Sequence, residues 1–154
     1  MEPGYLSKAK TYKKARYGNT CAKACLTFSI PSCDSAITYA VEGVKKVMQL
    51  LAMEEEWVFR SELSLHEALL NSYLHGNRAD PAREIWISCC LSPAKVQIEV
   101  EDEGRGYDPT ETEVLSDQDP TRLNGRGLFL IRQFMHSVTV SRRGNHIRMC
   151  LVKE

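Results

Sequence analysis

The most restrictive feature of this sequence is a change of hydrophobic period close to residue 84. Before it, apolar residues recur every three or four positions, as they do on the buried face of an α-helix. After it they alternate with polar residues, as in strands that bury one face. A sheet with one apolar face must be covered by helices, so the pattern predicts an α/β (α+β) two-layer sandwich. We expect a mostly antiparallel sheet with its helices on one face.

Before the change of period, a short strand and two helices are predicted. The strand covers 24–30 and stops at Pro31, after which Ser32 and Asp34 offer helix N-caps. The first helix runs to about Ala52, and its apolar face is expected to comprise Ile37, Ala40, Val41, Val44, Val47, Met48 and Leu51.

The second helix begins at 54–56 and ends near Gly76 and Asn77. Its apolar stripe should be Phe59, Leu63, Leu70 and Leu74, with Leu69 and Tyr73 on one flank.

Beyond the change of period, the alternation predicts two antiparallel strands joined by a turn at 92–95. Residues 103–124 lack periodicity, and a loop of this length inside a domain is usually functional, often a lid. A helix over 125–136 and a hairpin around Gly144 and Asn145 complete the chain. The helix should bury Leu128, Ile131 and Met135.

Length and composition narrow the class of protein. A chain of 154 residues corresponds to one domain, which we place at 23–154 behind a basic N-terminal extension at 1–22. The 20 basic and 20 acidic residues cancel, which argues against direct nucleic-acid binding. The sequence shows neither a membrane-spanning run nor a signal peptide, so we expect a cytoplasmic protein. The six cysteines contain no CxxC pair, so free thiols are favoured over zinc or disulfides.

The first candidate site lies on the second helix, where Glu67, Asn71 and His75 are spaced by four and should stack along one side. Glu67 is expected beside Leu63 and Leu74, at the edge of the apolar stripe, where the pKa of a carboxyl can be tuned. The carbonyl oxygen of Asn71 suits a hard cation such as magnesium. Taken alone, the cluster is as well explained by a solvated helix flank.

The second candidate is Asp102 with Gly104 and Gly106. Asp102 shares the parity of Val96, Ile98 and Val100, so its carboxylate should point to the apolar face. Burying it is costly unless a group such as the amino group of adenine donates a hydrogen bond. The glycines would let the backbone approach a flat ring. An ordinary strand-end turn is the alternative explanation.

The third candidate opens the helix near residue 125. Gly125 and Gly127 leave N–H groups and the positive end of the helix dipole facing outward, which suits phosphate. Arg122 and Arg126 add positive charge, and Leu128 follows the second glycine. A single Gly-x-Gly before a helix is weak support by itself.

Together, in this order, the three candidates resemble the Bergerat-type ATP-binding domain of the GHKL superfamily. Glu67-x-x-x-Asn71 resembles its N box, Asp102-x-Gly104-x-Gly106 its first glycine box, and Gly125-x-Gly127 its second. The runs HEALLNSYLHGN at 66–77 and GRGLFLI at 125–131 look closest to the small bacterial anti-sigma serine-protein kinases. The resemblance covers roughly residues 24–152.

This resemblance implies ATP and Mg²⁺ as cofactors, with Glu67 as general base, Asn71 as metal ligand and Asp102 as the adenine-binding residue. His75, Gly104, Gly106, Arg122, Gly125, Arg126, Gly127 and Leu128 are the further nucleotide-binding candidates. It also implies a homodimer, a sigma-factor client and an antagonist protein phosphorylated on serine.

Other functions remain open at this point. The main alternative is a nucleotide-gated binding module with little catalysis. The catalytic domain of a histidine kinase is weaker, because no phosphoacceptor helix pair is visible in the sequence. We do not favour a DNA-topology or chaperone ATPase, which would need further domains.

Overall fold

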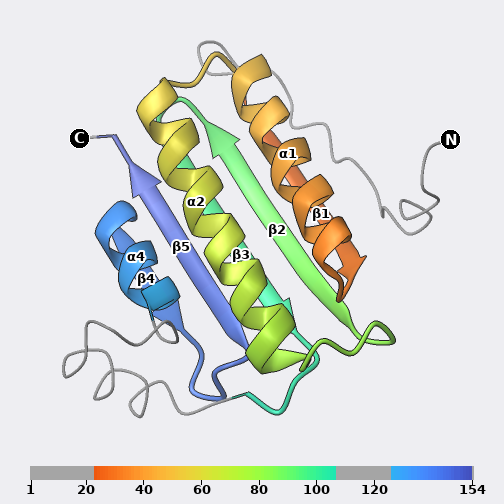
Figure 1. Cartoon of the computed structure of the whole chain (residues 1–154). Coiled ribbons are helices and arrows are strands. Elements are labelled where there is room, and N and C mark those ends of the chain that lie inside the picture. The colour runs from red at the N-terminus through yellow and green to blue at the C-terminus, as the bar shows by residue number, and fades with distance from the viewer. Residues whose placement is uncertain (1–22, 107–125, 154) are drawn as a thin grey trace, which may run out of the picture.

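The computed structural model describes residues 23–106 and 126–153, and its helices and strands follow the order expected from the sequence (Figure 1). They are β1 (Ala24–Pro31), α1 (Asp34–Leu50), α2 (Glu55–Asn71), η1 (Ser72–Gly76), β2 (Glu84–Ser92), β3 (Lys95–Asp102), α4 (Arg126–Phe134), β4 (Ser137–Val140) and β5 (His146–Val152). The basic extension at 1–22 and most of the predicted loop, residues 107–124, lie outside the described residues.

The described strands form one antiparallel sheet in the order β1-β2-β3-β5-β4. Helices α1, α2 and α4 all lie on the same face of it (Figure 1). The predicted two-layer α+β architecture is therefore confirmed. The turn between β2 and β3 is also confirmed, since Ser92 pairs with Lys95 and its hydroxyl bonds the Lys95 backbone.

The core lies between the sheet and the helices. The inward positions of β2 and β3 are almost fully buried, including Ile87 and Ile98, as their alternation predicts. In α1, Ile37 and Met48 are fully buried, and in α4 Ile131 is fully buried, which confirms the stripes predicted for these helices.

The face that α2 buries differs from the predicted one. Phe59 is 56% exposed and Leu74 is 51% exposed, whereas Leu69, placed on the flank, is fully buried. The buried residues of α2 are Trp57, Val58, Ser61, Ser64, Leu65, Ala68 and Leu69. Three of these seven are serine or alanine, and their small side chains contribute little to a pattern of large apolar residues.

The ends of the helices also correct the sequence analysis. Neither Ser32 nor Asp34 caps α1: the N-cap is Cys33, without a side-chain cap bond, and Asp34 is the first helical residue. The second helix does reach Gly76, but Ser72–Gly76 winds as a π-helix. The spacing of four that stacks side chains on an α-helix therefore ends at Asn71.

Candidate functional site

Asp102 is a buried carboxylate at the end of β3. Its side chain is 6% exposed and lies on the helix-facing side of the strand, as its parity predicted. The Gly104 N–H donates a 2.8 Å hydrogen bond to Asp102 Oδ1, and the Ser72 hydroxyl also donates to this carboxylate. Burial raises the pKa of the Asp102 carboxyl, and these two hydrogen bonds partly offset the rise.

Two glycines make room for this carboxylate. A Cβ on Gly76 would lie 2.5 Å from Asp102 Oδ1, and a Cβ on Gly104 would lie 2.7 Å from the same atom. The Cβ on Gly104 would also collide with the Gly76 backbone. Side chains larger than hydrogen are thus excluded where η1 meets the end of β3. The sequence predicts Gly104 as a site residue, but it predicts Gly76 only as a helix end.

Glu67 and Asn71 face the start of α4. A Cβ placed on Gly127 would lie 3.0 Å from Glu67 Oε2 and from Asn71 Nδ2, and 3.2 Å from Asn71 Oδ1. The N-box pair and the second glycine of the last motif, 56 residues beyond Asn71, are therefore neighbours in space. Because α2 buries another face than predicted, Glu67 lies toward α4 rather than at the edge of a Leu63–Leu74 stripe.

The end of α2 connects these two parts of the site. Asn71 faces α4, and the next residue, Ser72, bonds Asp102. A carboxylate and an amide near a helix N-terminus thus adjoin a second, buried carboxylate. Nothing in the periodicity singled out Ser72, because its role depends on a contact with a strand 30 residues further along.

Asn77 is a positioning residue that sequence reasoning missed. It is fully buried, its Nδ2 donates to the Glu84 carbonyl (2.9 Å), and its Oδ1 accepts from the Glu103 N–H (3.0 Å). This one amide therefore ties the end of η1 to the start of β2 and the end of β3. An asparagine after a helix could only be predicted as a terminator.

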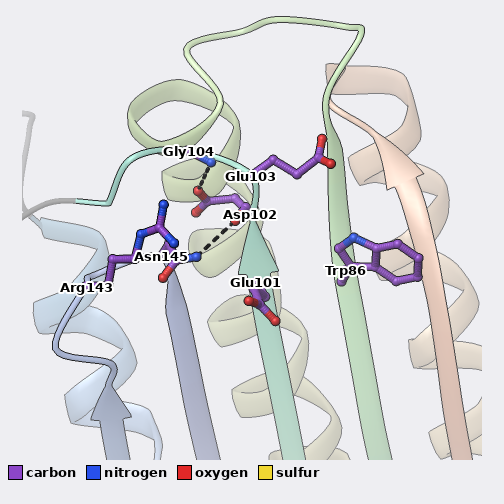
Figure 2. Close-up of a pocket in the computed structure, with 7 residues that line it drawn as sticks. All are labelled: Trp86, Glu101, Asp102, Glu103, Gly104, Arg143 and Asn145. Atoms are coloured by element: carbon purple, nitrogen blue, oxygen red, sulfur yellow. Dashed lines mark hydrogen bonds between the residues drawn. The ribbon is translucent and has the colours of Figure 1, made fainter.

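Asn145 holds Asp102 from the β4–β5 turn. The Asp102 N–H donates to the Asn145 carbonyl (3.0 Å), and Asn145 Nδ2 donates to the Asp102 carbonyl (3.2 Å). Figure 2 shows the latter bond together with the one between Gly104 and Asp102. The main chain of Asp102 is thus fixed independently of its carboxylate.

The remaining predicted residues fall into two groups. Among the described ones, His75 is exposed on the π-helix, Arg126 is exposed at the first position of α4, and Leu128 is buried. Gly106 has φ +80°, and a Cβ there would collide with the Arg143 carbonyl. Arg122 and Gly125 lie outside the described residues, so their predicted role stays a prediction.

A hollow of about 380 Å³ lies at the same end of the sheet (Figure 2). Trp86 and Glu101 are directly paired across β2 and β3 and point to the face away from the helices, opposite to Asp102. Neither Glu67 nor Asn71 lines this hollow. It is therefore distinct from the space where these side chains meet Gly127. Its lining residues are Trp86, Glu101, Asp102, Glu103, Gly104, Arg143 and Asn145.

Comparison with known proteins places this chain in a family. The family model described as histidine kinase-like ATPase domain matches residues 31–151. The chain therefore belongs to this family, which confirms the resemblance found in the sequence. An ATPase domain implies ATP binding.

Two relatives extend the comparison. An anti-sigma F factor of Oceanobacillus iheyensis is 31% identical over 77 residues, which cover 48% of this chain and 53% of the relative. The serine/threonine-protein kinase BtrW of Bordetella bronchiseptica is 27% identical over 111 residues, which cover 66% of this chain and 78% of the relative. The match thus spans about half of the first relative and most of the second.

The described residues contain no group of three or more His, Cys, Asp or Glu side chains able to hold a metal ion. The five cysteines among them are free thiols. In the same part of the chain, no helix is both long and apolar enough to cross a membrane.

Proposed function

We propose that this chain is an anti-sigma factor serine-protein kinase that uses Mg-ATP. It would bind a sigma factor and phosphorylate a serine of an antagonist protein, and so switch partners. The observation that carries the proposal is the meeting of Glu67 and Asn71 with Gly127 at the start of α4, next to the buried Asp102. The names of the two relatives support the partners and the phosphoryl transfer.

At the adenine end, Asp102 would accept a hydrogen bond from the exocyclic amino group. Oδ1 already accepts from the Gly104 N–H, and a carboxylate has further lone pairs for a ligand. Gly76 and Gly104 leave no side chain beside this carboxylate, which suits the close approach of a flat ring. Asn77 and Asn145 would hold the strand end in register while the base binds.

At the phosphate end, the nine-residue helix α4 begins at Arg126 and Gly127. Its N–H groups and positive dipole end would attract phosphate oxygens. The Asn71 side-chain oxygen, which faces the start of α4, is a hard oxygen donor of the kind that magnesium prefers, so Asn71 fits the ion. When bound, Mg²⁺ would neutralise charge on the phosphates.

In this mechanism, Glu67 would take the proton from the serine hydroxyl of the antagonist. Asn71 would orient the nucleotide through the metal, and the start of α4 would stabilise the charge on the transferring group. We also propose that the protein acts as a cytoplasmic homodimer in transcription regulation.

A pair of assays on each variant tests the proposal: nucleotide affinity by calorimetry, and phosphate transfer from labelled ATP to the co-purified antagonist. A positioned general base contributes about 10²–10⁴-fold to the rate. Glu67→Ala should therefore bind ATP with unchanged affinity, while its rate of phosphate transfer should fall by roughly that factor. Asn71→Ala should weaken Mg-nucleotide binding itself, because it removes a metal ligand.

Glu62→Ala is the matched control, since Glu62 lies on the same helix but pairs with Lys45 of α1 (3.1 Å). It should leave both assays unchanged. If wild type binds ATP but transfers no phosphate, the chain is a nucleotide-gated binding module and the kinase proposal fails. If Glu67→Ala transfers phosphate at the wild-type rate, Glu67 is not the base.

A further inference from the structure

Two cysteines outside the candidate site face each other across the first two strands. Cys25 of the edge strand β1 lies directly opposite Cys90 of β2. Both are free thiols and partly exposed. The neighbouring Cys89 is fully buried under the helices, so Cys25 and Cys90 lie on the opposite face of the sheet, which none of the described helices covers.

The hydrogen-bond pattern shows what kind of pair they form. The Ser32 N–H donates to the Arg83 carbonyl (3.0 Å), and these two residues continue the register one step beyond Pro31 and Glu84. Bonded and non-bonded pairs alternate along antiparallel strands, and Cys25 is an odd number of positions from Ser32. Cys25 and Cys90 are therefore a non-hydrogen-bonded pair.

This kind of pair brings side chains into contact. Its Cα atoms lie about 4.5 Å apart, inside the range of roughly 4.4–6.8 Å that disulfides span. Thr27 and Ser88 form the next non-hydrogen-bonded pair, and their side chains are in contact, since Thr27 Oγ1 lies 3.3 Å from Ser88 Oγ. The two thiols themselves share a hydrogen bond, which together with the larger effect of burial raises the pKa of Cys90.

We propose that Cys25 and Cys90 form a reversible disulfide when the protein meets a peroxide. The thiolate of one cysteine attacks a peroxide oxygen, the O–O bond breaks, and a sulfenic acid and water form once the leaving hydroxide takes a proton. The thiol of the other attacks this sulfur, the S–O bond breaks, and a second water leaves. The two thiols lose two electrons and two protons, and one hydrogen peroxide becomes two waters.

The bond would close a long loop. The segment between Cys25 and Cys90 contains α1 and α2, including Glu67 and Asn71. Closing such a loop restricts the unfolded chain, and it would also fasten the edge strand to its only neighbour in the described sheet. We expect the oxidised protein to melt roughly 5–10 °C above the reduced one.

The test treats the folded, reduced chain with hydrogen peroxide, blocks remaining thiols with iodoacetamide, and maps peptides by mass spectrometry without reductant. Trypsin releases Cys25 on the peptide 24–45 and Cys90 on the peptide 84–95. The proposal expects these two peptides joined by a bond that dithiothreitol breaks. Melting curves with and without dithiothreitol provide the second measurement.

Variants identify the bonded residues, because Cys33 and Cys89 travel on the same two peptides. Cys25→Ser and Cys90→Ser should each abolish the linked peptides and the shift in melting temperature, whereas Cys33→Ser should abolish neither. Cys150→Ser is the matched control: Cys150 lies in the same row of the sheet, but two strands from Cys90 across Gln97. That separation is about 9–10 Å, too far for a disulfide.

Two results would overturn the proposal. One is a wild-type protein whose cysteines are oxidised to sulfinic acid, or form disulfides with other cysteines, while the peptides 24–45 and 84–95 stay unlinked. The other is a link that survives in Cys90→Ser. A wild-type map without this link overturns the proposal by itself, so a variant that misfolds does not remove the test.

Discussion

Replacing Gly76 with alanine tests the contact between η1 and the buried carboxylate. The new Cβ would stand 2.5 Å from Asp102 Oδ1, whereas ordinary contact begins near 3.4 Å. The carboxylate must therefore withdraw by about 1 Å, the difference between these distances. Its bond with the Gly104 N–H, now 2.8 Å, would then exceed hydrogen-bond length.

The energetic cost follows from this bond. Losing a hydrogen bond to a charged group costs about 1.5–3 kcal/mol, and replacing a helical glycine with alanine returns up to about 1 kcal/mol. We expect the free energy of unfolding to fall by roughly 1–2 kcal/mol in urea titrations, with an unchanged slope. If Asp102 binds adenine, ATP affinity measured by calorimetry should fall as well.

Gly43→Ala is the matched control, because Gly43 lies within α1 and nothing comes within 4 Å of its added Cβ. This variant should gain about 0.5–1 kcal/mol from helix propensity. The free energies of unfolding of the two alanine variants should therefore change in opposite directions and differ by roughly 1.5–3 kcal/mol. If Gly76→Ala proves as stable as Gly43→Ala, the close packing of Gly76 on Asp102 is not as described.

Two further predictions concern the same network. The pKa of Asp102 is raised above its ordinary value near 3.8, so the native state holds this proton more tightly than the unfolded chain. The associated stability is complete below that value and is lost as pH rises through the native pKa. The free energy of unfolding of Asp102→Asn, measured in urea titrations, should therefore rise relative to that of wild type as pH increases from about 4, and a difference that does not change with pH would contradict this. Asn77→Ala removes two bonds from a buried amide and should cost about 2–6 kcal/mol in urea titrations, so a loss below about 1 kcal/mol would contradict its positioning role.

Several features of this protein follow from local pattern. The helical stripe of α1, the alternation of β2 and β3, and the inward parity of Asp102 need only side-chain period and a buried face. Each of these periodic patterns extends over many residues, so one residue that departs from the pattern does not change the prediction. The order and spacing of the three motifs also predicted the family, and the family match confirms that prediction.

Other features were decided by tertiary structure. The buried face of α2 was mispredicted because it includes small residues such as Ser64 and Ala68, which carry little hydrophobic signal. The contacts of Glu67 with Gly127 and of Ser72 with Asp102 join residues 60 and 30 positions apart. Local sequence pattern cannot predict contacts between residues so far apart in the sequence. These contacts depend on how α4 and β3 pack against α2.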